Sequence, residues 1–157
     1  MRKLIASGLL TAVSLVAVAA AALVMAQTPA APTAAAAPPR TASPPGAEAY
    51  FISPKDGATV HNPVLVQFGL KGMGIAPAGV KFDNTGHHHL LIDSDPPADQ
   101  SLPLPATDKI VHFGKGQTET TLMLPPGKHT LELLFADYTH VSFNPPLHSK
   151  KITITVD

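Results

Sequence analysis

The chain has no cysteine and no tryptophan among its 157 residues. Without cysteine it can form no disulfide, it can offer no thiolate to a metal, and no lipid can be attached to a cysteine after signal cleavage. A folded domain must therefore be stabilised by side-chain burial alone. Imidazole, present in eight histidines, is the best transition-metal ligand that remains.

The sequence also lacks a charge excess and the common catalytic motifs. Eleven basic residues balance eleven acidic ones, so there is no basic surface of the kind that binds nucleic acid. Neither the Gly-x-Ser-x-Gly motif of hydrolases nor the His-Glu-x-x-His motif of metalloproteases occurs. We therefore expect a protein that is not an enzyme and does not bind nucleic acid.

The first 26 residues resemble a secretory signal peptide. Arg2 and Lys3 precede an uncharged apolar run over residues 4–24, and small residues around Ala26 are typical of a cleavage site. The alternative is a retained transmembrane anchor, because the run is long enough to span a bilayer. We expect cleavage, a periplasmic or secreted product, and no membrane span afterwards.

Residues 27–47 consist mainly of alanine and proline, with six prolines. Such a segment has little apolar surface to bury, and we expect a disordered, semi-extended linker that adds nothing to stability. The folded domain is then expected over residues 48–157.

Short alternating segments indicate that this domain is all-β. No segment has a helical period, and proline- or glycine-rich turns separate about seven predicted strands, which favours an immunoglobulin-like antiparallel β-sandwich. The predicted strands are 49–53, 64–70, 87–93, 110–113, 117–124, 129–136 and 152–156.

Several motifs resemble those of the bacterial domain of unknown function (DUF) 4399 family. They are the segments at 50–54, 71–74, 85–93, 112–114, 116–119, 124–131 and 144–146. The resemblance covers residues 50–156 and implies an exported bacterial domain with no established reaction. Relatives often have histidine where this chain has Phe143, so the pattern departs from the family at that position.

In such a sandwich, the loops after the second, fourth and sixth strands lie at one end. Four histidines are predicted to converge there, and we expect them to bind a metal: His87, His89, His112 and His140. Nitrogen ligands suit copper or zinc, and Met73 in the first of these loops would add a soft ligand for Cu(I). We expect such a site to lose its ion as the pH falls through about 6, because imidazole protonates near its ordinary pKa of about 6.5.

The other histidines have different expected environments. The segments 86–92 and 127–133 share a Gly-x-His-x-Leu pattern, which turns His88 and His129 toward the core edge, where backbone groups would satisfy them. His61 and His129 belong to the opposite end of the sandwich. His148 is expected nearer the histidine-rich end.

Two functions fit these observations. One is an exported, non-enzymatic binding module that holds a protein, glycan or small ligand through the loops of the histidine-rich end. The other is a periplasmic metal-binding protein that uses the four histidines for copper or zinc.

Overall fold

The computed structural model describes residues 39–157, and every regular element in that range is a β-strand. The expected signal peptide and the first part of the expected linker lie outside the described residues. Within residues 39–157 no helix is long and apolar enough to cross a membrane. The strands are β1 (Glu48–Ser53), β2 (Thr59–Val60), β3 (Val64–Lys71), β4 (Gly74–Ile75), β5 (Thr85–Ile92), β6 (Ile110–His112), β7 (Glu119–Leu122), β8 (Gly127–Ala136), β9 (Ser142–His148) and β10 (Ile152–Val156).

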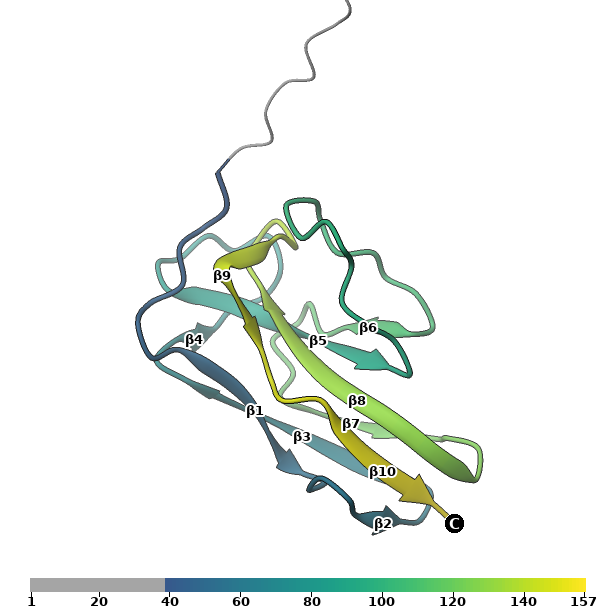
Figure 1. Ribbon diagram of the computed structural model, residues 1–157. Coiled ribbons are helices and arrows are strands. Elements are labelled where there is room, and N and C mark those ends of the chain that lie inside the picture. The colour runs from purple at the N-terminus through teal and green to yellow at the C-terminus, as the bar shows by residue number, and fades with distance from the viewer. Residues whose placement is uncertain (1–38) are drawn as a thin grey trace, which may run out of the picture. The chain divides into compact units, whose positions relative to one another are not determined.

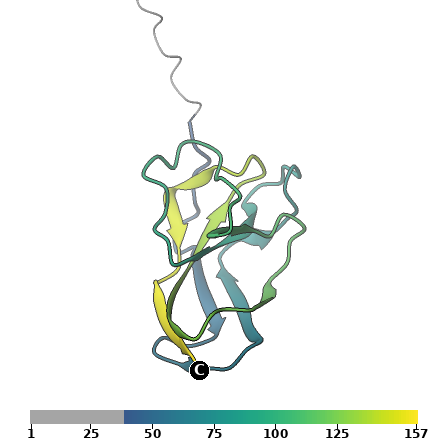
Figure 2. The same ribbon diagram turned by 90° about the vertical axis from the view of Figure 1, so that its right-hand side faces the viewer.

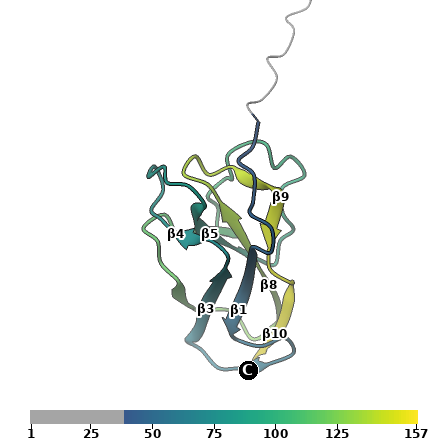
Figure 3. The same cartoon turned by 90° about the vertical axis from the view of Figure 1, so that its left-hand side faces the viewer.

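The strands form two sheets (Figure 1). One has the order β1-β3-β7, and the other has the order β2-β10-β8-β5-β4, with β6 paired to β5 and β9 paired to β8. The major pairings are antiparallel, and the short β2 and β4 pair in parallel with β10 and β5. Figure 3 shows β1 and β3 side by side. The predicted immunoglobulin-like sandwich is confirmed, because the first, second and fifth predicted strands share one sheet and the third, sixth and seventh share the other.

The main core lies between the two sheets. Val64, Val66 and Phe68 alternate along β3 and are buried against residues of the other sheet, including Leu131 and Leu133. Burying one such side chain contributes about 1.5–3 kcal/mol to folding relative to leaving it exposed. The alternation that predicted these strands is therefore also what stabilises them in a chain without disulfides.

The opposite face of the β5–β8 pair is buried as well. Leu91, Leu134 and Ala136 form a second apolar cluster with Leu104 and Ile110. Leu104 comes from the connection between β5 and β6, so part of that long loop lies over the outer side of the sheet. Side chains of β5 that point away from the main core therefore enter a second enclosed layer.

Strand β9 was predicted to be part of a loop, and that prediction is wrong. Leu147 pairs with Phe135, and Ser142 pairs with Ala136 on β8. Pro145 and Pro146 lie within β9 and are exposed. Proline cannot donate a ladder hydrogen bond, but an edge strand can accommodate it because one side of its backbone has no partner strand.

The linker was expected to reach residue 47 without contacts, and residues 40–47 depart from that expectation. Arg40 donates a hydrogen bond to the carbonyl of Phe143 (2.8 Å), and Thr41 Oγ1 donates to Asp137 Oδ2 (2.8 Å). Backbone hydrogen bonds also join this segment to Asn144. Composition indicated too little apolar surface for ordering, but polar groups on β9 and its preceding loop supply the partners.

Three loops meet at the end of the sandwich away from the C-terminus, as Figures 1 and 2 show. Ala78 N donates to Gly114 O and Gly79 N donates to Tyr138 O, each at 2.9 Å. These bonds tie the loop before β5 to the loops after β6 and β8. We call this end, with its loop residues 76–80, 113–116 and 137–141, the histidine end.

Candidate metal centre

The three histidines of β5 point to two different faces of the sheet. His88 is paired with Phe135, whereas His87 and His89 are paired with Ala136 and Leu134. Directly paired residues of antiparallel strands share a face, so His88 points into the main core and its two neighbours point to the outer layer. The predicted sorting of these side chains is confirmed.

The pairing of β6 with β5 places His112 directly beside His89. The two rings are stacked, with centroids 5.0 Å apart and an interplanar angle of 28°. Gly114 makes room for this ring, because a Cβ at that position would lie 2.2 Å from Cε1 of His112. No sequence pattern indicated that the fourth predicted strand would join this sheet rather than the other.

His140 reaches the same place from the loop between β8 and β9. Its backbone has a positive φ of 68°, which non-glycine residues rarely adopt. The Asp137 carboxylate stabilises the loop by accepting hydrogen bonds from the backbone N–H groups of Thr139 and Val141 and from the hydroxyls of Thr139 and Thr41.

The four imidazole rings form one compact group. From His87, the ring centroids of His89, His112 and His140 lie at 4.9, 5.0 and 5.0 Å. From His112, the centroids of His89 and His140 lie at 5.0 and 4.7 Å, and His89 to His140 is the longest separation at 6.2 Å. Five of six separations are nearly equal, so the centroids describe a distorted tetrahedron. All four predicted site residues are therefore brought together.

Three of these histidines are especially close. His87, His89 and His112 each offer a ring nitrogen within 4.8 Å of the other two. His87 and His89 are fully buried, and both nitrogens of each ring have no hydrogen-bond partner among the described residues. The buried Nε2 of His112 also has none.

Burial keeps these rings neutral. Desolvation, with repulsion from neighbouring histidines as a smaller cause, lowers the pKa of His87 to about 4 and that of His89 to about 3. Burial also lowers the pKa of His112, with a further contribution from His140. Neutral imidazole has a free lone pair, so the cluster holds its nitrogens in the form that binds metals.

His88 is buried in the main core between aromatic rings. Its ring centroid lies 5.3 Å from that of Phe68 and 5.0 Å from that of Phe135. Neither of its nitrogens has a hydrogen-bond partner among the described residues, so the prediction that backbone groups satisfy it is wrong.

The remaining histidines have acidic partners. His129 contacts Asp93 Oδ2 through Nδ1 (2.7 Å) and the carbonyl of Pro125 through Nε2 (2.9 Å), so it is satisfied as predicted, with a carboxylate in addition. His148 lies between Glu132 and Gln100. His61 pairs with Asp157 at the opposite end. None of these three belongs to the ring cluster.

Met73 does not join the histidines. It lies against the apolar cluster of Phe135, Phe143 and Leu147, on the main-core side of β8. His87 and His89 lie on the other side of the sheet. The expectation that Met73 supplies a thioether ligand is therefore wrong. Phe143, the position that departs from the family pattern, also belongs to this apolar cluster.

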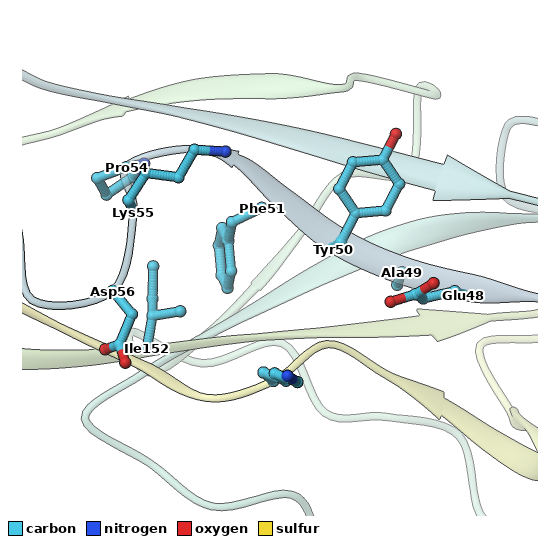
Figure 4. A pocket seen from close by; sticks show the side chains of 9 residues that line it. Glu48, Ala49, Tyr50, Phe51, Pro54, Lys55, Asp56 and Ile152 are labelled. Atoms are coloured by element: carbon cyan, nitrogen blue, oxygen red, sulfur yellow. The ribbon is translucent and has the colours of Figure 1, made fainter.

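A surface hollow of about 250 Å³ lies far along the sandwich, beside β1 and β10. In Figure 4, Phe51 and Ile152 point toward the space between these strands, and Tyr50 lies on the other side of β1. Its charged residues, including Glu48, Lys55 and Asp56, are on the exposed surface. No group of ligating side chains converges in this hollow, so it is a weaker candidate for a site than the histidine cluster.

Comparison with known proteins identifies the family. No curated protein and no solved structure matches the chain. One family model, described as a domain of unknown function (DUF4399), matches residues 66–157. The matched range contains all four clustered histidines, most of β3, and all the strands from β4 to β10. The chain therefore belongs to the DUF4399 family.

Proposed function

We propose that this domain binds a transition-metal ion, copper or zinc, at His87, His89, His112 and His140. The observation that carries the proposal is the convergence of buried, neutral imidazoles whose nitrogens have no partner among the described residues. In this view the protein is a non-enzymatic binding module, and the metal is its ligand.

The energetic cost of the cluster supports a ligand. A buried polar group without a partner costs about 1–3 kcal/mol, and several such nitrogens share one small region. Apolar side chains of similar size would fill this layer without that cost, as Leu91 and Leu134 do beside it. An ion that accepts the lone pairs would offset the cost.

The geometry favours a tetrahedral ion. A square-planar arrangement would have two diagonals about 1.4 times as long as its sides, whereas here only the His89–His140 separation of 6.2 Å is clearly longer than the rest. Zinc prefers four-coordinate tetrahedral sites with nitrogen ligands. Cu(II) remains a strong competitor, because it binds nitrogen ligands more tightly than zinc does.

Thermal unfolding with metal tests the proposal. Zinc in about hundredfold excess over its Kd should stabilise the untagged protein by about 2.7 kcal/mol, which is roughly 10 °C in a domain of this size. The double variant His87→Ala with His89→Ala should lose this shift. His61→Ala should keep it, because that residue lies at the opposite end and pairs with Asp157.

Two results would contradict metal binding. One is an untagged protein whose melting temperature at neutral pH responds to neither zinc nor copper. The other is an equal loss of the shift in His61→Ala and in the double variant. Either result would favour the histidine end as a contact surface for a protein or glycan.

We further propose that the mature protein acts in the periplasm or outside the cell, on the basis of the signal-like residues 1–26. N-terminal sequencing of protein from the periplasm or medium should then begin at Gln27. A product that keeps Met1 and fractionates with membranes would instead support the retained anchor.

A further inference from the structure

Resting on the proposed metal binding, we propose that the four histidines have different roles. His87, His89 and His112 form a permanent set of three nitrogen ligands, and His140 is an exchangeable fourth ligand. When His140 turns away, the metal offers its open position to a small external donor, of which imidazole is the simplest probe.

The first support is the position of each ligand in the fold. His87 and His89 lie on β5, in the middle of a sheet, and His112 lies on β6, which is paired to β5. Strand pairing fixes the backbone at all three positions, because β5 is paired with β8 and with β6, and β6 is paired with β5. His140 lies in a loop, so no strand ladder constrains its side chain.

The second support is the difference in burial. His87 and His89 are 0% and 1% exposed, whereas His140 is only partly buried. The buried nitrogens without a partner belong to the three strand histidines and to His88, and no nitrogen of His140 is among them. The ring of His140 can therefore turn toward water at little cost, whereas the rings of His87 and His89 are enclosed; His112 is partly buried like His140, but its Nε2 is buried without a partner.

The third support is geometric. A ring nitrogen of each strand histidine lies within 4.8 Å of the other two, and His140 is not part of this close set. Its ring centroid is also 6.2 Å from that of His89, the longest separation in the cluster. Three protein ligands with an open fourth position are the arrangement of zinc sites that accept external ligands.

Two hydrogen bonds hold the backbone of His140 beside the cluster. His140 N donates to Asp137 O (2.9 Å), and Leu104 N donates to His140 O (2.8 Å). These bonds keep the Cα beside the cluster. Exchange therefore requires only rotation of the side chain, and the ring can return to the metal without refolding of the loop.

Cobalt(II), whose visible spectrum reports its coordination, tests the assignment in the full-length untagged protein. His140→Ala should keep bound Co(II) but bind it roughly tenfold more weakly or more, since loss of even an outer-shell partner costs about 10–100-fold in metal affinity, and should release it faster to EDTA. Added imidazole should change the Co(II) spectrum of this variant and slow the release. His89→Ala should lose Co(II), without rescue by imidazole, and His61→Ala should match the wild type.

The outcomes separate the two proposals. If the wild type binds no Co(II) or zinc, the proposed function itself is wrong. If the wild type binds metal but His140→Ala loses it as completely as His89→Ala does, the four ligands are equivalent and the exchangeable position is wrong. An unchanged release rate and spectrum in His140→Ala, with or without imidazole, would also overturn it, because His140 would then not be a ligand.

Discussion

His88 differs from the histidines on either side of it because it faces the main core. It lies between Phe68 and Phe135, and burial lowers its pKa to about 4. His88 lies between two proposed ligands in the sequence. Its imidazole points to the opposite face of β5 and so cannot reach the metal site. We infer that it affects folding rather than metal binding.

The lowered pKa predicts how His88 affects stability in acid. Between pH 6.5 and about 4 the unfolded chain binds a proton that folded His88 does not, so stability falls as the pH falls through this range. One such histidine contributes a slope of at most about 1.4 kcal/mol per pH unit. His88→Leu should reduce the slope of the metal-free protein, measured by urea unfolding with a chelator present.

Control measurements make this prediction specific. His88→Leu should keep or raise stability at pH 7, because it removes a buried imidazole without a partner. His61→Ala removes a largely exposed imidazole and serves as the control for loss of a histidine outside the core. A wild-type slope in His88→Leu would mean that this imidazole is protonated in the folded state or hydrated.

The same physics revises the expected pH response of the metal site. A site built from ordinary imidazoles would begin to lose its ion near pH 6. Because burial lowers the pKa of His87 to about 4 and that of His89 to about 3, protons compete for these nitrogens in the folded protein only in stronger acid.

His129 has the opposite effect on stability. Its hydrogen bond to Asp93 raises the pKa of His129, so the pair stabilises the fold at low pH and this stabilisation is lost as the pH rises.

At the scale of elements, hydrogen bonds from the segment 40–47 stabilise the loop that carries His140. Thr41 Oγ1 donates to the carboxylate of Asp137, and that carboxylate also accepts from Thr139 and Val141. The segment therefore supports the loop between β8 and β9, although it belongs to no sheet. This role connects a proline-rich stretch to the proposed fourth ligand.

Truncation tests this connection. A chain that begins at Glu48 should melt more than about 5 °C below a chain that begins at Pro39, because it lacks the bonds from Arg40 and Thr41, and a hydrogen bond to a charged group contributes about 1.5–3 kcal/mol. Differential scanning calorimetry of the two chains measures the difference. Thr41→Val in the longer chain isolates the bond to Asp137 and should cause part of the loss.

Equal melting temperatures for the two truncated chains would show that these contacts add no net stability. The original expectation from composition, a linker without energetic effect, would then hold for residues 40–47 as well. A loss in Thr41→Val as large as that of the whole truncation would assign the effect to Asp137 alone.

At the scale of the whole molecule, the loops at the histidine end are joined to one another. The loop before β5 is bonded to Gly114 and Tyr138, and Leu104 is bonded to His140. Four separate parts of the chain therefore fix the surroundings of the ring cluster. We infer that a ligand bound there stabilises the whole sandwich rather than one hairpin, because each of these segments connects strands of the main sheets.

The sequence by itself determined the seven predicted strands, the sandwich and the sorting of the β5 histidines. Alternation of apolar residues has a period of two, and burial of one face fixes which histidines share a side. Thus Val64, Val66 and Phe68 predicted β3, and Leu90 predicted that His87 and His89 face away from the main core. These are local properties, and a single strand contains the information.

Only the tertiary structure decided the surroundings of the cluster. The pairing of β6 with β5, rather than with the other sheet, sets His112 beside His89. Burial of the outer layer under the loop with Leu104 lowers the pKa values of the clustered histidines. The position of Met73 on the opposite side of the sheet excludes its thioether from the proposed metal site. These features depend on contacts between segments far apart in the chain, where hydrogen-bond partners and burial are shared, and no local periodicity encodes them.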